Sequence, residues 1–388
     1  MKIVHISPRS PYNDDWGYQD NLLPKYQRKL GHEVVMITTN IMHKDGKLVE
    51  TDCADYVLSD GVRVIRKKYK QYFHSTLTGV LARLDVFGLL EELQPDFIFY
   101  HGLVSYTVYD VVRYVKKHPH CKFVEDNHMD YNIGNPTATA KDKAIRAWLR
   151  LMNCIPAKYA AKIYGVTPWR KTYAEDYFRI PASKTDVLIM GADDEKMDLA
   201  HRPQIRQEMR ALYHISDQDF LIVTGGKIDR KKKIDLLMQA CAELKDVKLL
   251  VFGNVAEDVR EQFDALVKQE NILYVGWIES DQVYRYFYAA DLVFFPGQHS
   301  VLWEQACASK TPCVFEKWEG MDHVNNGGNS DFVAPVTVET IKEKIRQLHF
   351  TEQYYAMKAA AESEKTDIYL YSHIARKSLE VISAEKGM

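Results

Sequence analysis

A single acidic residue lies in a stretch whose pattern is typical of a ligand-binding edge. Residues 294–315 read FFPGQHSVLWEQACASKTPCVF, which predicts an apolar strand, a polar turn at 298–300, a helix beginning near Val301 and a second apolar strand. In an open parallel sheet, such a βαβ step points the N–H groups of a helix N-terminus at an anion beyond the carboxyl end of the strand. Glu304, in the first helical turn, could there accept hydrogen bonds from ribose hydroxyls. Alternatively, it only complements the helix dipole.

A group of cations follows a predicted strand earlier in the second half. Phe220–Thr224 (FLIVT) predicts a strand, residues 225–233 (GGKIDRKKK) a loop, and the sequence through Leu244 a helix. Two glycines and several cations between a strand and a helix suit the binding of a diphosphate. The loop has neither the Walker A spacing nor GxGxxG, so the nucleotide motifs of fixed spacing are absent.

Two candidate residues lie in the first half of the chain. The predicted strand Lys122–Asp126 ends in NHMDY, and polar residues at the carboxyl end of a strand occupy the position at which α/β sheets bind ligands. His128 is therefore a candidate, although a lone histidine can be structural. Gly17, in the long loop after the first predicted strand, either lets the backbone approach a ligand or serves a turn.

Strands and helices alternate along the whole chain. This alternation predicts an α/β fold with two Rossmann-like, doubly wound parallel sheets. We expect one domain at 1–190 and a second at 191–365, followed by a helical tail at 366–388. Pro156 should kink or break the long helix predicted over 141–162. The predicted strands include Lys2–Ser7, Glu33–Thr38, Gly61–Ile65, Asp96–Tyr100, Val247–Phe252 and Asp291–Phe295.

Charge and composition limit the classes of function. The 388 residues carry a net charge of −2, which makes no case for nucleic acid as a partner. Residues 1–185 contain 27 Lys and Arg against 20 Asp and Glu, and the remainder contains 24 against 33. A basic first half suits an anionic surface or substrate, although such an imbalance also arises by chance. The basic run Arg66–Lys70, beside Tyr72 and Phe73, either contacts an anionic lipid surface or forms a solvated face.

Nothing in the sequence indicates export or a membrane span. Six cysteines show no CxxC pair and no Cys/His metal-ligand spacing, which favours a reduced, intracellular protein. The N-terminus, MKIVHISPR, is too brief and too polar for a signal peptide. No apolar run approaches the ~20 residues needed to cross a bilayer. We expect a cytoplasmic protein that is at most peripheral at the inner face of the membrane.

The patterns together resemble the GT-B glycosyltransferases, specifically the retaining, nucleotide-sugar-dependent enzymes of family 4 (glycosyltransferase group 1). The resemblance covers nearly the whole chain and is strongest in Phe220–Val333. In that family a Gly-Arg pair and a downstream lysine hold the donor diphosphate, and the matching positions here are Gly226, Lys227 and Lys232. Lysine in place of arginine keeps the charge and loses the bidentate fork.

Glu304 matches the second of two glutamates, separated by seven residues, in the nucleotide-sugar motif of the family, where it binds the ribose. The first glutamate is absent, because counting back eight residues from Glu304 gives Pro296. Gln298, His299 and Ser300 fill a loop that is shortened. In the family the first acid contacts the donor sugar, so its replacement leaves open which sugar is transferred and whether the protein turns over. Gln298 can still bond a sugar hydroxyl, and His299 could do so or act as a cation.

The resemblance extends to positions outside this motif. The VGW turn, with Gly276 and Trp277, resembles the strand end that lines the nucleobase pocket. Gly17 resembles the glycine-containing loop that faces the donor phosphate, and His128 resembles the histidine that faces the donor sugar. The resemblance also implies that the first domain binds the acceptor, that the second binds the nucleotide sugar, and that the helix at 366–388 returns to the first domain.

A metal-independent transferase of class EC 2.4 follows from the resemblance. It would move a sugar, with retention, from a UDP- or GDP-linked donor to a saccharide or lipid-linked acceptor in polysaccharide biosynthesis. Lys227, Lys232 and the helix start at Val301 and Leu302 would stabilise charge on the departing phosphate. No DxD triplet lies at the exposed end of a predicted strand, so we expect neither a metal nor another cofactor. Two alternatives stay open: a nucleotide-sugar epimerase or hydrolase on the same fold, and an inactive relative that only binds the nucleotide sugar.

Overall fold

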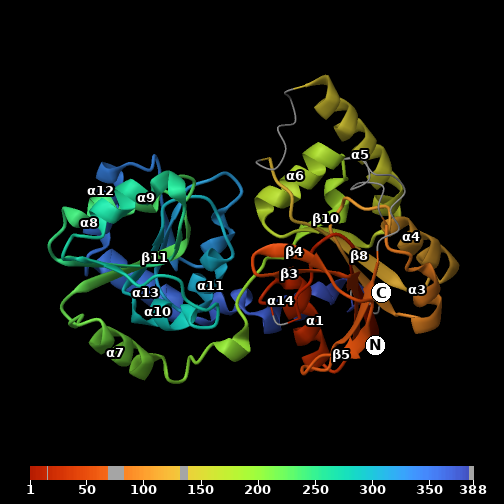
Figure 1. Cartoon of the computed structure of the whole chain (residues 1–388), viewed down its shortest axis with the longest axis horizontal. Coiled ribbons are helices and arrows are strands. Elements are labelled where there is room, and N and C mark those ends of the chain that lie inside the picture. Colours follow the sequence, from red (N-terminus) through yellow and green to blue (C-terminus); the bar gives the residue numbers. More distant parts are fainter. Residues whose placement is uncertain (15, 69–82, 132–138, 384–388) are drawn as a thin grey trace. The chain divides into compact units, whose positions relative to one another are not determined.

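Two parallel β-sheets, each covered by helices, organise the chain (Figure 1). The α/β fold class predicted from the alternation of strands and helices is confirmed. The chain divides into two units: unit 1 contains Met1–Ile189 and Tyr371–Met388, and unit 2 contains Met190–Leu370. The computed structural model describes residues 1–14, 16–68, 83–131 and 139–383.

The sheet of unit 1 has eight strands in the order β10-β9-β8-β7-β1-β2-β6-β5. Neighbouring strands are parallel except β5 and β6, which are antiparallel. The strands are β1 (Lys2–Ser7), β2 (Glu33–Thr39), β5 (Asp55–Val57), β6 (Arg63–Lys67), β7 (Phe97–His101), β8 (Lys122–Asn127), β9 (Lys162–Gly165) and β10 (Thr185–Val187). A separate antiparallel pair consists of β3 (Ile41–Lys44) and β4 (Lys47–Glu50).

Helices cover this sheet because its central strands are apolar on both faces. Apolar residues of β1, β2, β7 and β8 are buried almost completely, as expected for parallel strands that have a helical layer on each side. Thr139 caps the longest helix by accepting a hydrogen bond from the backbone N–H of Asp142. The helices of unit 1 are α1 (Gln19–Lys29), α3 (Phe87–Leu93), α4 (Val108–Lys117), α5 (Ala140–Tyr159), α6 (Pro168–Phe178), α14 (Tyr371–Ser378) and α15 (Glu380–Ser383).

The sheet of unit 2 has six parallel strands in the order β13-β12-β11-β14-β15-β16. Its strands are β11 (Phe220–Ile228), β12 (Val247–Val255), β13 (Ile272–Tyr274), β14 (Leu292–Phe295), β15 (Cys313–Glu316) and β16 (Ser330–Val333). Its α-helices are α7 (Arg202–Leu212), α8 (Ile234–Ala242), α9 (Arg260–Leu266), α10 (Val283–Ala289), α11 (Leu302–Ala308), α12 (Val338–Leu348) and α13 (Glu352–Glu362). Short 3-10 turns are η1 (Ala182–Lys184) in unit 1, and η2 (Asp194–Lys196), η3 (Glu257–Val259), η4 (Asp322–Val324) and η5 (Glu364–Tyr369) in unit 2.

The glycine pair at 225–226 lies inside a strand, which corrects the loop predicted from the sequence. β11 continues through both glycines to Ile228 and pairs with β12 along its whole length. A Cβ atom on Gly253 of β12 would collide with the carbonyl oxygen of Gly226. The two strands therefore approach too closely for side chains at this point, and the glycines are needed for packing. The loop between β11 and α8 is restricted to residues 229–233.

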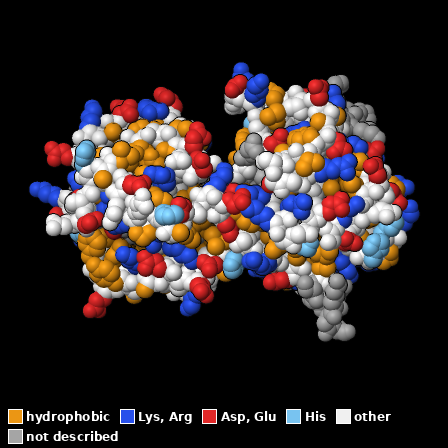
Figure 2. All heavy atoms as spheres, turned by 90° about the horizontal axis from the view of Figure 1, so that it is seen from below, with side chains coloured by type: hydrophobic (Ala, Val, Ile, Leu, Met, Phe, Trp, Pro, Cys, Tyr) orange, Lys and Arg blue, Asp and Glu red, His pale blue; other side chains and the backbone are white. Residues whose placement is uncertain are grey.

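The basic run at the end of β6 does not form a continuous exposed patch. Arg66 is buried, and its guanidinium lies 2.7 Å from the Asp14 carboxylate and donates to the Tyr56 hydroxyl. The prediction of a lipid-facing Arg66 is therefore wrong. Lys70, Tyr72 and Phe73 lie outside the described residues. Figure 2 shows basic and acidic side chains mixed on the visible face of both units, and within the described ranges no helix is both long and apolar enough to cross a membrane.

Candidate active site

Glu304 lies inside unit 2 with one carboxylate oxygen between two histidines. The loop after β14 leads into α11, which carries Glu304 in its first turn. The Nε2 atoms of His299 and His323 both lie 2.8 Å from Glu304 Oε1. The side chain of Glu304 is fully buried, yet its Oε2 has no hydrogen-bond partner among the described residues. One oxygen is therefore used inside the protein, and the other is left without a donor.

The two histidines keep Glu304 ionised in spite of its burial. Burial raises the pKa of a carboxyl group, but the charge of His299 and the hydrogen bonds from His299 and His323 outweigh it and lower the pKa of Glu304 to about 2. The Trp303 ring packs edge-on against His299, with the centroids 5.2 Å apart. The Tyr369 hydroxyl donates to the backbone carbonyl of His323 at 2.7 Å. A fixed negative charge thus lies in the first turn of α11.

Lys232 ties the loop after β11 to the loop after β14. Its ammonium donates to the backbone carbonyls of Gln298, at 2.5 Å, and of His299, at 3.2 Å. Burial lowers the pKa of Lys232 to about 8, and this effect outweighs the nearby charge of Asp229. A Cβ atom on Gly297 would collide with the backbone of Lys232, so the two loops touch directly. The structure therefore brings Lys232 into contact with Gln298 and His299, which were predicted from a different part of the sequence.

The start of α11 lies against the glycine pair of β11. A Cβ atom on Gly226 would lie 2.9 Å from Leu302 Cδ1. Ser300 and Val301 begin the helix, and their carbonyl oxygens accept from the N–H groups of residues 303 and 305, each at 3.0 Å. The start of α11 is thus formed and surrounded by Gly226, Ser300, Val301 and Leu302.

The other predicted residues of the donor site are more exposed. The Lys227 side chain is 71% exposed, and its ammonium lies 3.3 Å from the Asp229 carboxylate. Gly276, after β13, accepts a hydrogen bond from the N–H of residue 253, and the Trp277 side chain is largely exposed. A Cβ atom on Gly17 of unit 1 would meet nothing within 4 Å. No steric requirement in the described structure explains this glycine, and its contact with a ligand stays a prediction.

His128 belongs to a polar group at the carboxyl ends of the unit 1 strands. Its Nε2 lies 3.3 Å from the buried carboxylate of Asp126, and 40% of its side chain is exposed. His101, at the end of β7, donates from Nδ1 to the same oxygen of Asp126 at 2.8 Å. Asp20, in the first turn of α1, lies 3.5 Å from this nitrogen. Asn127 bonds the backbone of residues 129 and 170, which fixes the loop that carries His128.

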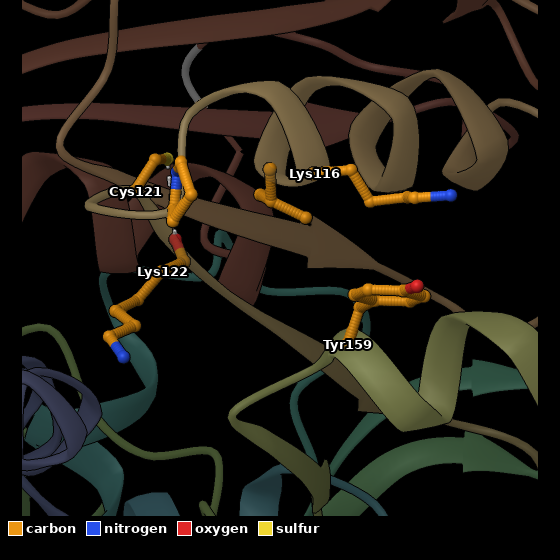
Figure 3. Close-up of a pocket in the computed structure, with 6 residues that line it drawn as sticks. Lys116, Cys121, Lys122 and Tyr159 are labelled. Atoms are coloured by element: carbon orange, nitrogen blue, oxygen red, sulfur yellow. Dashed lines mark hydrogen bonds between the residues drawn. The ribbon is translucent and has the colours of Figure 1, made fainter.

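A hollow elsewhere in unit 1 contains none of the predicted residues. Figure 3 shows this hollow, which lies beside α4, the first residue of β8 and the end of α5. It therefore lies at the opposite end of β8 from Asp126. The lining residues are Val115, Lys116, Pro119, Cys121, Lys122 and Tyr159.

Residues 205–363, which include the Lys232 and Glu304 loops, match the family model of the glycosyl transferases group 1. This part of the chain belongs to that family. A stretch of 77 residues is also 28% identical to an "Uncharacterized 41.2 kDa protein in cps region" of Klebsiella pneumoniae, and it spans 20% of this chain and 21% of that protein. The family membership supports glycosyl transfer as the chemistry of the protein.

Solved structures confirm that the fold of the chain is GT-B. A glycosyltransferase from Rickettsia africae has a TM-score of 0.70 at 16% identity, over 99% of this chain and 98% of that one. Anabaena Alr3699/HepE in complex with UDP has a TM-score of 0.68 at 16% identity, over 99% and 100%. The UDP-GlcNAc 2-epimerase of Neisseria meningitidis, bound to UDP-GlcNAc, has a TM-score of 0.60 at 14% identity, over 99% and 100%. At these identities the likeness concerns the fold alone.

Among the described residues, two triplets contain side chains of the kinds that ligate metals. Within each, the potential ligand atoms lie within 4.8 Å of one another. Hydrogen bonds and ion pairs between histidine nitrogens and carboxylate oxygens account for these separations. We therefore assign neither triplet as a metal site. The triplets are Asp20, His101 and His128 in unit 1, and His299, Glu304 and His323 in unit 2.

Sequence reasoning missed the partners that hold the predicted residues. His323 lies in η4, between β15 and β16, and no motif spacing connects it to Glu304. His101 ends β7, and the apolar run before it signals only a buried strand. His299 was a candidate for the sugar, but its Nε2 is bonded to Glu304. Only the fold identifies His299 and His323 as supports of the carboxylate.

Proposed function

We propose that the protein transfers a sugar from a nucleotide diphosphate sugar to a saccharide or lipid-linked acceptor, with retention of configuration and without a metal. The observation that carries this proposal is the group formed by Lys232, Gln298, His299 and Glu304 within the glycosyl transferases group 1 domain. A half-buried cation, Lys232, lies on the loop after β11, and a buried carboxylate, Glu304, lies in the first turn of α11; the loop that leads into α11 touches the Lys232 loop. Both loops follow the carboxyl ends of parallel strands, where open α/β sheets bind ligands.

In this proposal, Glu304 binds the ribose of the donor through Oε2. Its Oε1 already accepts two hydrogen bonds, from His299 and His323. A ribose hydroxyl would supply the donor that Oε2 lacks. Because a buried, ionised acceptor without a donor is costly, donor binding would relieve an unfavourable feature of the free protein.

Two cations would act on the diphosphate: Lys227, near the end of β11, and Lys232, in the loop after it. Lys227 is exposed, and Lys232 is half-buried and bonded to the loop that leads into α11. In the front-side path, the bond between the anomeric carbon and the β-phosphate oxygen breaks while the acceptor oxygen attacks on the same face. The leaving phosphate takes the acceptor proton. Fixed positive charge at the phosphate stabilises this transition state more than the ground state.

The missing first glutamate leaves Gln298 as the residue we assign to the transferred sugar. Its backbone carbonyl accepts from Lys232, and its amide side chain makes no hydrogen bond within the described part of the chain. A neutral amide can both donate to and accept from sugar hydroxyls. In unit 1 we assign to His128 the other hydrogen bond to the sugar, as the resemblance implies.

For the donor we favour a uridine or guanosine nucleotide, and Alr3699/HepE, with its bound UDP, supports the former. The acceptor we propose is a growing polysaccharide or lipid-linked saccharide, reached in the cytoplasm at the inner face of a membrane. The excess of basic residues in 1–185 supports this setting.

The test is calorimetric binding of UDP, GDP, ADP and CMP to the wild type, Glu304→Gln and Glu339→Gln. Glu339 is an exposed acid in the first turn of α12, so its variant controls for a simple helix-dipole effect. One nucleotide should bind the wild type and Glu339→Gln equally, and Glu304→Gln about tenfold or more weakly, because a charge-assisted hydrogen bond is lost. Equal binding by both variants would refute the assignment of Glu304.

Product analysis separates the proposal from its alternatives. A transferase forms a new glycoside only when acceptor is present. The UDP-GlcNAc 2-epimerase with the same fold supports the strongest alternative, which would change the sugar or release free nucleotide without any acceptor. Tight nucleotide binding with no turnover across a panel of acceptors would favour an inactive relative instead.

A further inference from the structure

Three adjacent strands and two helices of unit 1 bring a line of polar side chains into its interior. His5 of β1, His101 of β7 and Asp126 of β8 lie on neighbouring parallel strands. Gln27 comes from α1 and Ser378 from α14. All five side chains are buried. Buried polar groups in contact must arrange their protons so that every bond has one donor and one acceptor.

Ser378 fixes the direction of the first bonds in this line. Its hydroxyl lies 2.6 Å from the carbonyl oxygen of Ala375, which can only accept, so the single hydroxyl proton points there. The neighbouring Gln27 atom, 2.9 Å from the hydroxyl oxygen, must then be the donating Nε2. The amide of Gln27 is thereby oriented, and its Oε1 faces His5 Nε2 at 2.7 Å. His5 must carry a proton on Nε2.

The same reasoning fixes the protons of His101. Burial and the neighbouring His101 lower the pKa of His5 to about 3, so His5 is neutral and its Nδ1 has no proton. His101 Nε2, which lies 3.0 Å from this nitrogen, must donate to it. His101 Nδ1 lies 2.8 Å from an oxygen of Asp126, and an ionised carboxylate only accepts. His101 therefore carries protons on both nitrogens.

The charges around His101 suit an imidazolium. The groups that face it are His5 from β1, Asp20 from α1, Asp126 from β8, and His128 from the loop after β8. Burial lowers the pKa of His101, but the charges of Asp20 and Asp126 together outweigh burial and raise it. The second oxygen of Asp126 accepts from the N–H of Gly102 at 2.8 Å, so this carboxylate is held from two sides.

We propose that His101 is a positioning residue, a buried imidazolium that keeps Asp126 ionised and oriented behind His128. The carboxylate of Asp126 lies 3.3 Å from Nε2 of the partly exposed His128. The functional role of His128 rests on the proposed function, whereas the charge of His101 does not. The chain of donors and acceptors begins on α14, so the C-terminal segment contributes to the electrostatics of this edge as well as to packing.

The test is nitrogen-15 NMR of histidine-labelled full-length protein between pH 6.5 and 8.5. The variant His101→Gln assigns the resonances by their loss. In the wild type, both ring nitrogens of His101 should be protonated at pH 7.5. A neutral His101 tautomer at pH 7.5 in the wild type would overturn the proposal, whether or not any variant folds.

Two matched variants of β8 identify the partner of His101. Asp126→Asn should lower the pH at which His101 loses its second proton, because only Asp20 then remains as an acid that faces it among the described residues. Glu125→Gln is the control, because burial raises the pKa of this adjacent acid to about 8 and the substitution then removes little charge at pH 7. His101 should stay an imidazolium in Glu125→Gln. An imidazolium that persists equally in Asp126→Asn would refute Asp126 as its partner.

Kinetics then separates positioning from a merely structural role. In His101→Gln, kcat should fall with KM nearly unchanged, and the pH profile of kcat/KM should change in shape, since a cation that faces Asp126 and His128 is lost. An equal fall of kcat/KM at every pH would indicate structural damage and contradict the positioning role. If the wild type shows the imidazolium but no transfer with any donor, the proposed function fails and the charge assignment stands.

Discussion

The substitution Glu304→Gln tests whether the two histidines stabilise unit 2 through the charge of this carboxylate. It keeps the size of the side chain and an acceptor oxygen for His299 and His323, and it removes only the charge. The pKa of Glu304 is about 2 in the folded protein, against 4.5 for an unperturbed glutamate. At about 1.36 kcal/mol for each pH unit, this difference corresponds to about 3 kcal/mol of folding free energy at pH 7.

The sign and pH range follow from the lowered pKa. A carboxyl group whose pKa is lower in the folded state stabilises the protein fully above its unfolded pKa, and the stabilisation is lost as the pH falls through the folded pKa. The contribution of Glu304 should therefore be about 3 kcal/mol at pH 7 and less than half of that at pH 3. Glu304→Gln should be less stable than the wild type by roughly these amounts.

The assay is urea unfolding at pH 7 and pH 3, followed by tryptophan fluorescence, because Trp303 lies against His299. Glu339→Gln is again the control, and it should change the free energy of unfolding by at most about 1 kcal/mol. A destabilisation by Glu304→Gln that is the same at both pH values would refute the reasoning, because it would then arise from packing and not from charge.

Two further predictions concern the loops and glycines of the donor domain. Because the pKa of Lys232 is about 8, nucleotide affinity measured by titration calorimetry should fall as the pH rises from 7 to 9, and this fall should vanish in Lys232→Arg. Lys232→Ala should lower kcat about 10²-fold or more. Unchanged turnover in Lys232→Ala would contradict the role of Lys232. Gly253→Ala should destabilise unit 2 by about 1–3 kcal/mol in urea unfolding because its Cβ would collide with Gly226. Gly17→Ala, in unit 1, is the control and should leave the free energy of unfolding unchanged. Equal stabilities of the two variants would show that β11 and β12 can separate at no cost.

The periodic elements of this chain could be predicted because their patterns are local. The alternation of strands and helices, the βαβ step around Glu304 and the helix start near Val301 agree with the structure. The glycines at 225–226 were misassigned to a loop, because a pair of glycines before several cations is also typical of a phosphate-binding turn. Their role in the structure depends on Gly253, which lies on a different strand.

Residues that depend on distant partners could not be predicted. Pro156 was expected to kink or break its helix, yet α5 continues to Tyr159. A proline leaves the carbonyl four residues earlier without its N–H donor, and here the hydroxyl of Tyr109 donates to that carbonyl, of Met152, at 2.8 Å. In the same way, the burial of Glu304 between two histidines depends on His323 in η4. No local pattern contains this information.

The bond between Gln27 and Ser378 joins residues 351 positions apart in the sequence, which has a consequence for the order of folding. Unit 1 is built from the two ends of the chain, and the whole of unit 2 lies between them. Since domains fold as units during synthesis, from the N-terminus onward, residues 1–189 emerge long before α14 is made. The amide of Gln27 then has no Ser378 to orient it, and Tyr26 has no Tyr371 to stack on. A helix that is synthesised after the whole of unit 2 therefore completes the first unit to begin folding.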